Sequence, residues 1–217
     1  MTPSVALLAL ATAVPQHVLL QTDVAATARA LFASRFADYD RLATVFETAG
    51  VTQRQAVRPI AWYAEARGWP ERTAVYLEAG GALFVDATRK ALRAAGRTAR
   101  DVDTIVTVSS TGIATPSLEA RVLVELGFRS DVARVPVFGL GCAGGVSGLS
   151  IAARLAQARP GSLVLFVAVE LCSLAFRLDE FTKANVVATA LFGDGAAACL
   201  LSTATGGLAT IDGGGEH

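Results

Sequence analysis

The residues best suited to chemistry lie in one glycine-rich segment, FGLGCAGGVSGL, at positions 138–149. The pattern predicts a tight turn between a buried strand and a buried helix, and Cys142 lies in that turn. Glycines allow such a sharp bend, and the free N–H groups and dipole of a helix N-terminus favour a thiolate and any oxyanion beside it. Cys142 is therefore a candidate nucleophile.

Two other interpretations of this segment stay open on spacing alone. Gly139, Gly141 and Gly144 spell G-x-G-x-x-G, and Glu170 follows Gly144 by 26 residues at the end of the next predicted strand. These are ingredients of a dinucleotide-binding fold, although the motif lies far from the N-terminus, behind an earlier strand and helix. In the other interpretation, Cys142 is a small buried core residue and the glycines allow close helix packing.

The elements that must position this turn alternate along the chain. Strands are expected at 5–13, 104–110, 134–139, 163–170, 196–201 and 207–211, and helices at 22–36, 38–48, 73–95, 118–126, 143–158 and 180–189. The continuous apolar run at 163–170 is typical of a strand covered on both faces. This alternation predicts the α/β class, with a layered domain and a central mixed, mostly parallel sheet. Because no repeat or linker divides the chain, residues 1–217 are expected to form one domain.

Composition excludes several classes of function. With 53% apolar and 18% charged residues among 217, the chain can form a compact core, which excludes disorder. Nineteen basic residues balance nineteen acidic ones, so binding to nucleic acid or to an anionic membrane surface is not expected. No Lys or Arg precedes the apolar segment 5–13, which favours a buried strand over a signal peptide. We therefore expect a cytoplasmic protein without a membrane span.

The other nucleophilic or metal-binding candidates are few: Cys172, Cys199, His17, His217 and Asp194. The cysteines lack the spacing of metal ligands or of a disulfide framework. His17 and His217 stand near the two ends of the chain, and each is expected to be structural or exposed. Asp194, between two glycines, has no partner carboxylate and is expected to stabilise its own turn. The sequence therefore predicts no metal site, and Cys199 is expected in a strand core.

Four sequence blocks resemble the type III polyketide synthases, the chalcone and stilbene synthase family of the thiolase fold. The blocks are STGIATPS at 110–117, GLGCAGGVSGL at 139–149, VELCSLAFR at 169–177 and ALFGDGAAACLL at 190–201, and ATAVPQHVLLQ at 11–21 resembles the opening strand and turn of the family. The resemblance covers only the N-terminal half of the family. It implies a thiolase-like fold, Cys142 as the acyl-accepting nucleophile, and acyl-coenzyme A and malonyl-coenzyme A as substrates, without a further cofactor.

The resemblance also implies roles on the coenzyme A side of the site. Phe192, before Gly193 and Asp194, matches the phenylalanine that stands between the coenzyme A tunnel and the acyl cavity. The alternative is a core aromatic residue at a strand end. Arg54 lies near the basic contacts that the family makes to the phosphates of coenzyme A, so we expect it to bind substrate.

Other matching positions line the acyl cavity. Ser110, Cys172 and Ala175 fall on cavity-lining positions of the family, and Thr115 matches the residue that reaches into the cavity of the partner subunit, which implies a homodimer. Plant chalcone synthases carry threonines where this chain has Cys172 and Ala175. The smaller, less polar walls predict a fatty acyl starter and an alkylpyrone or alkylresorcinol product.

These observations favour an acyltransferase of the type III polyketide synthase class. The alternatives are an initiating β-ketoacyl-carrier-protein synthase of the same fold, a truncated domain that serves only in dimer assembly, and a dinucleotide-binding reductase. In the family, a His and an Asn of the C-terminal half complete the catalytic site, and that half is absent from these residues. Residues 1–217 alone are therefore expected to be inactive.

Overall fold

The structure is a computed structural model that describes residues 3–178 and 182–214. The chain divides into two compact units, and each has its own core. The first unit comprises Met1–Ala13, Leu77–Glu170 and Ala196–His217, and the second comprises Val14–Tyr76 and Leu171–Gly195. Among the described residues, no helix is both long and apolar enough to cross a membrane.

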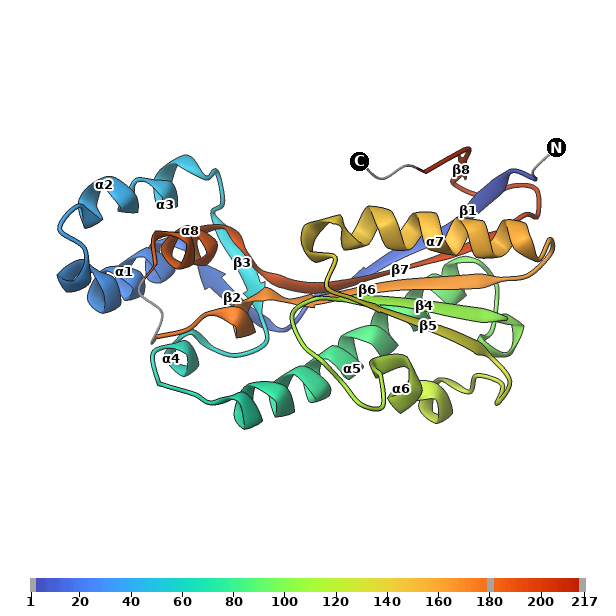
Figure 1. Cartoon of the computed structure of the whole chain (residues 1–217), viewed down its shortest axis with the longest axis horizontal. Helices are drawn as coiled ribbons and strands as arrows, with labels where there is room; N and C mark the ends of the chain where they lie inside the picture. Colours follow the sequence, from blue (N-terminus) through green and yellow to red (C-terminus); the bar gives the residue numbers. More distant parts are fainter. Residues whose placement is uncertain (1–2, 179–181, 215–217) are drawn as a thin grey trace. The chain divides into compact units, whose positions relative to one another are not determined.

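A six-stranded sheet forms the first unit (Figure 1). Its strands are β1 (Val5–Ala13), β4 (Thr104–Ser109), β5 (Ala133–Phe138), β6 (Val164–Leu171), β7 (Asp194–Ser202) and β8 (Ala209–Ile211), in the order β5-β4-β6-β7-β1-β8. Strand β4 pairs in parallel with β5 and β6, whereas β1 pairs antiparallel with β7 and β8. The sheet is therefore mixed, and each strand expected from the sequence is present within two residues of its predicted ends.

Three long helices cover this sheet: α5 (Trp69–Ala94), α6 (Leu118–Leu126) and α7 (Gly144–Ala158). Figure 1 shows α7 on one face of the sheet, and α6 with most of α5 on the other. Helix α6 ends as predicted at Gly127, whose φ of 76° is the left-handed conformation that glycine adopts without strain. The predicted α/β layering is thus confirmed.

The core between α7 and the sheet consists of small helix residues and larger strand residues. Its buried members include Ala152, Ala153 and Ala156 on the helix, and Val106, Val108, Val164, Phe166, Cys199 and Leu201 on the strands. Alanine and glycine let the helix axis approach the sheet closely, and each fully buried Val, Leu or Phe contributes about 1.5–3 kcal/mol. This packing fixes α7, and with it the turn that leads into its N-terminus.

The second unit is mainly helical. It contains α1 (Gln21–Phe32), α2 (Tyr39–Ala43), α3 (Val45–Thr48), α4 (Ile60–Tyr63) and α8 (Lys183–Leu191), with a two-stranded antiparallel sheet of β2 (His17–Leu20) and β3 (Gln53–Ala56). Its core includes Val24, Phe32, Phe46, Val186 and Ala190. The helix predicted at 38–48 is two short helices that meet at Thr44, and residues 180–181 of the helix predicted at 180–189 lie outside the described part of the chain.

Candidate active site

Cys142 lies in the predicted strand-to-helix turn. Strand β5 ends at Phe138, a short 3-10 turn spans Gly141–Ala143, and α7 begins at Gly144. Gly139 and Gly141 have φ values of 87° and 55°, a region that residues with a Cβ rarely adopt. The side chain of Cys142 is exposed. The described structure therefore does not support the interpretation of Cys142 as a core residue.

Two glycines after the cysteine, Gly144 and Gly148, allow α7 to pack closely on the sheet. A Cβ on Gly144 would lie 2.6 Å from Cγ1 of Val108, and a Cβ on Gly148 would lie 2.5 Å from Cε2 of Phe166. These positions are four apart, so they share one face of α7, and that face lies on β4 and β6. The third glycine of the G-x-G-x-x-G pattern thus has a structural explanation in close contact between helix and sheet.

Ser110 lies beside the cysteine turn. It follows the last residue of β4, and the backbone N–H of Gly141 donates a hydrogen bond to its Oγ at 2.9 Å. Because β4 and β5 are parallel neighbours, their carboxyl ends bring Ser110 and Cys142 to the same edge of the sheet. Thr115, further along the loop after β4, is exposed, and its carbonyl oxygen accepts a hydrogen bond from Arg121.

Glu170 stabilises the loop that follows β4. Its carboxylate accepts hydrogen bonds from the backbone N–H of Ser110 at 2.9 Å and from the hydroxyl of Thr111 at 2.7 Å. Partial burial raises the pKa of Glu170, which the hydrogen bonds from Thr111 and Ser110 oppose. In the dinucleotide interpretation Glu170 would bind a ribose. In the structure its carboxylate instead holds the loop that carries Ser110.

Cys172 and Ala175 lie in the second unit, in a 3-10 turn that spans Cys172–Ala175 directly after β6. Cys172 is half-buried and Ala175 is exposed. Asp194 anchors this turn, because its carboxylate accepts hydrogen bonds from the backbone N–H of Ser173 at 2.8 Å and from the Ser173 hydroxyl at 2.5 Å. The Asp194 carboxylate also accepts a hydrogen bond from the backbone N–H of Val57 at 2.8 Å.

Asp194 therefore links two segments that are distant in sequence, at Val57 and Ser173. From its two flanking glycines we expected it to stabilise only its own turn. Burial raises its pKa, against the lowering effect of the hydrogen bonds from Ser173 and Val57. The hydroxyl of Tyr63 lies 2.7 Å from the Ser173 hydroxyl, and burial raises the pKa of Tyr63 to about 12. Tyr63, Ser173 and Asp194 thus form one polar network under the 3-10 turn.

Phe192 follows the last residue of α8, and its side chain is 45% exposed. This exposure contradicts the alternative of a core aromatic residue. The backbone N–H of Phe192 donates to the carbonyl oxygen of Ala188 at 3.0 Å, so the end of α8 sets the path of the backbone here. The gating role that the resemblance implies for Phe192 stays a prediction.

Arg54 is placed differently from the expectation. Its side chain is buried, at 8% exposure, and its terminal nitrogens donate to the carbonyl oxygens of Thr189, Ala190 and Phe192 and to Oε1 of Gln21. The predicted contact with a coenzyme A phosphate needs an accessible N–H, but both terminal nitrogens already bind oxygens of this chain and Nε is buried. We therefore leave Arg54 out of the coenzyme A site.

The other candidates lie away from this chemistry. Cys199 is buried in β7 as predicted, and burial raises the pKa of its thiol to about 12. His17 is half-buried in β2, and His217 lies outside the described residues. No group of three potential metal ligands occurs within residues 3–178 and 182–214.

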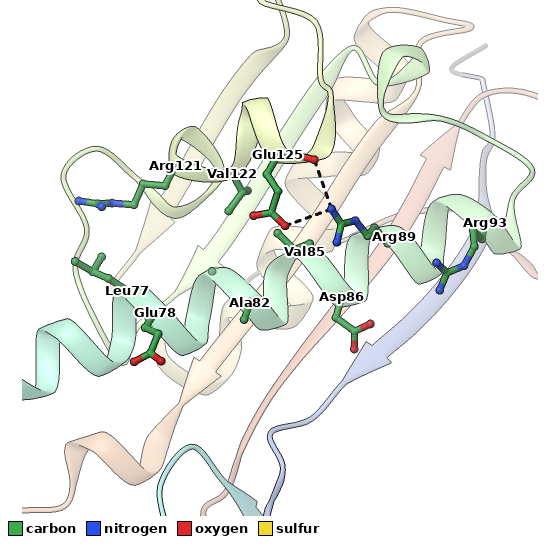
Figure 2. Close-up of a pocket in the computed structure, with 11 residues that line it drawn as sticks. Leu77, Glu78, Ala82, Val85, Asp86, Arg89, Arg93, Arg121, Val122 and Glu125 are labelled. Atoms are coloured by element: carbon green, nitrogen blue, oxygen red, sulfur yellow. Dashed lines mark hydrogen bonds and ion pairs between the residues drawn. The ribbon is translucent and has the colours of Figure 1, made fainter.

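A groove of about 520 Å³ lies between α5 and α6 in the first unit (Figure 2). Its floor includes Val85 and Val122, and Arg89 and Glu125 form an ion pair at 3.3 Å along it. Since α7 covers the other face of the sheet, this groove is separate from the turn of Cys142. None of the site residues predicted from the sequence lines it.

Comparisons with known proteins agree with the sequence blocks. Residues 2–205 match the family described as chalcone and stilbene synthases, N-terminal domain. The 1,3,6,8-tetrahydroxynaphthalene synthase of Streptomyces peucetius is 44% identical over 187 residues, which are 86% of this chain and 49% of that protein. The α-pyrone synthesis polyketide synthase-like Pks18 of Mycobacterium tuberculosis is 32% identical over 199 residues, 88% of this chain and 50% of that protein.

The fold comparison gives the same result. The crystal structure of 1,3,6,8-tetrahydroxynaphthalene synthase from Streptomyces coelicolor, a bacterial type III polyketide synthase, superimposes with a TM-score of 0.88 at 31% identity, over 93% of this chain and 57% of that one. The predicted thiolase-like fold is thereby confirmed. The chain spans about half the length of the relatives it matches. With the family match across most of its length, the chain belongs to the chalcone and stilbene synthase family of type III polyketide synthases.

Proposed function

We propose that the full-length protein is an acyltransferase that condenses an acyl-coenzyme A starter with malonyl-coenzyme A. The observation that carries the proposal is Cys142, which is exposed in a glycine turn at the start of α7 with Ser110 beside that turn. A cysteine in this position can act as a nucleophile and later as a leaving group, and both steps favour sulfur over oxygen.

The proposed reaction has two stages. The Cys142 thiolate attacks the carbonyl carbon of the starter thioester, and coenzyme A leaves as its thiolate. Malonyl-coenzyme A then loses carbon dioxide, and the resulting enolate carbon attacks the Cys142 thioester. The carbon–sulfur bond to Cys142 breaks, which frees the thiolate and leaves a β-ketoacyl-coenzyme A. The family resemblance implies oxyanion donors from a His and an Asn, which we expect outside residues 1–217.

The proposed starter is a fatty acyl group. Cys172 and Ala175 present small, weakly polar side chains, and each enclosed methylene contributes about 0.8 kcal/mol, so four more carbons would contribute roughly 3 kcal/mol. The proposed product is an alkylpyrone or alkylresorcinol, and the relative named for α-pyrone synthesis supports the pyrone. A homodimer with Thr115 at the partner's cavity completes the proposal, and the cytoplasmic location stays a prediction.

Acylation at Cys142 is the direct test. The full-length gene product is incubated with dodecanoyl-coenzyme A, and its intact mass and peptide map are measured. We expect a single adduct on Cys142 that the Cys142→Ala variant lacks and that the matched variants Cys172→Ala and Cys199→Ala keep. An adduct that survives Cys142→Ala would contradict the proposed nucleophile.

Competition among hexanoyl-, dodecanoyl- and coumaroyl-coenzyme A tests the starter class. We expect dodecanoyl-coenzyme A to be preferred, and we expect Ala175→Phe to shift the preference toward hexanoyl-coenzyme A because the larger ring shortens the cavity. A preference for coumaroyl-coenzyme A that Ala175→Phe leaves unchanged would remove the basis for a fatty acyl starter.

A further inference from the structure

A buried polar clamp, formed by Arg54 and Gln21, lies at the end of α8 in the second unit. The Arg54 guanidinium donates to the carbonyl oxygen of Ala190 at 2.9 Å and to that of Phe192 at 3.3 Å, and it also contacts the carbonyl oxygen of Thr189. Gln21 Oε1 accepts a hydrogen bond from the same guanidinium. Both side chains are at least nine-tenths buried.

Gln21 holds the guanidinium in place. Its Nε2 donates to the carbonyl oxygens of Phe46 and Ala190, each at 3.1 Å, while its Oε1 faces Arg54. The amide orientation is therefore set by two acceptors on one side and a cation on the other. The last carbonyl groups of a helix lack partners within the helix, so a buried cation at this end can accept that role by donating hydrogen bonds to them. Its positive charge also interacts favourably with the negative end of the helix dipole.

The clamp reaches the backbone of Phe192 and Gly193. A Cβ on Gly193 would lie 3.2 Å from Cβ of Arg54 and 3.3 Å from the carbonyl oxygen of Gln55, so this part of the chain lies directly against β3. Phe192 as a whole residue is 45% exposed, so contacts within the described chain hold it only in part. Its direction therefore depends strongly on the backbone that Arg54 binds.

We propose that Arg54, oriented by Gln21, is a positioning residue that sets the direction of the Phe192 side chain and thereby the choice of starter. The inference rests on the proposed function, in which Phe192 stands at the entrance to the acyl cavity. Arg54 acts through the backbone of residues 189–192 and does not touch the substrate. Lysine keeps the charge but cannot bind three carbonyl oxygens and Gln21 with the planar fork of arginine.

A double-mutant cycle on starter preference tests the proposal in the full-length gene product. The ratio of kcat/KM for dodecanoyl- to hexanoyl-coenzyme A is measured for the unmodified protein, Arg54→Lys, Phe192→Ala and the double variant. This ratio does not depend on the fraction of active enzyme, so a substitution that only reduces the amount of folded protein leaves it unchanged. We expect Arg54→Lys to change the ratio about tenfold when Phe192 is present, and less than about twofold in the Phe192→Ala background.

The control is Arg41→Lys, because Arg41 lies in the same unit and its 82% exposed side chain makes an ion pair with Asp38. It should leave the ratio unchanged in both backgrounds. If Arg54→Lys changes the ratio equally with and without Phe192, or leaves it unchanged in a folded protein, the proposal is wrong. Where Arg54→Lys does not fold, Gln21→Asn replaces it in the same cycle with the same criteria.

Hydrogen exchange separates this proposal from the proposed function. In Arg54→Lys, the amides of residues 189–193 should exchange at least about tenfold faster, while those of α7 stay unchanged. If the unmodified protein makes no product from these substrates, the proposed function fails while the exchange result still decides whether the clamp holds Phe192. Unchanged exchange at residues 189–193 would overturn the positioning role even in an active enzyme.

Discussion

Gly148→Ala is expected to destabilise the protein although alanine is the better helix former. The added Cβ would lie 2.5 Å from Cε2 of Phe166 and 2.6 Å from Cγ2 of Val108, whereas ordinary carbon contacts begin near 3.4 Å. Val108 lies on β4 and Phe166 on β6, two paired strands in the core of the first unit, so neither side chain can move freely. Overpacking of this kind typically costs about 1–3 kcal/mol.

Gly145→Ala is the matched control for helix propensity. Gly145 lies in the same helix, and a Cβ there would meet no atom within 4 Å. Alanine in place of glycine gains about 0.5–1 kcal/mol in a helix interior. Gly148 has this interior position, whereas Gly145 is the second residue of α7 and gains less, so the difference between the variants gives a lower bound on the cost of the clash. Urea unfolding of the two variants, followed by circular dichroism, should place Gly148→Ala about 1–3 kcal/mol below Gly145→Ala. Equal free energies of unfolding would refute the close packing of α7 on the sheet.

Three further predictions concern reactivity, pH and completeness. Iodoacetamide at pH 8 should label the exposed Cys142 in the folded protein and should not label Cys199, because burial raises the pKa of that thiol to about 12. Peptide maps that show label on Cys199 would contradict its burial. Because burial raises the pKa of Glu170, the folded state loses stability as the pH rises from the ordinary glutamate pKa through the raised one. Glu170→Gln should therefore gain stability relative to the unmodified protein over this rise in pH in urea titrations, and a parallel pH dependence of the two proteins would refute this. Purified residues 1–217 should form no malonyl-dependent product, since each missing oxyanion donor costs about 100- to 1000-fold in rate; a rate equal to that of the full-length protein would show that the donors lie within this chain.

The sequence predicts the first unit well because its elements have strong local signals. Strand β1 occupies Val5–Ala13, and α6 occupies Leu118–Leu126, both at the predicted positions. Gly127 adopts the left-handed conformation that its place after a helix implies. Apolar runs and helix-ending glycines depend only on neighbouring residues, so they can be recognised without knowledge of the tertiary structure.

In the second unit the helix predicted at 22–36 is present as α1, but the small sheet and the supports of the site could not be predicted in this way. Strand β3 reads QRQA, a polar segment without an apolar pattern, and it is a strand because it pairs with β2. The partners of Arg54, Glu170 and Asp194 are largely backbone groups, and the backbone partners of Arg54 lie 135 or more residues away. Because every residue carries the same backbone groups, the sequence contains no signal of which one a side chain binds.

The glycine motif shows why one pattern suits two functions. Gly139 and Gly141 are needed for their backbone conformation, whereas Gly144 is needed because a Cβ would meet Val108. A dinucleotide fold and a nucleophile turn both need a sharp bend from strand to helix and a helix close to the sheet, so both select glycine at the same spacing. The residue inside the bend carries the difference: here it is Cys142, exposed at the carboxyl edge of the sheet, where Ser110 follows the end of β4. Functional assignment of such a turn should therefore depend on the side chain that the glycines present and not on the glycines themselves.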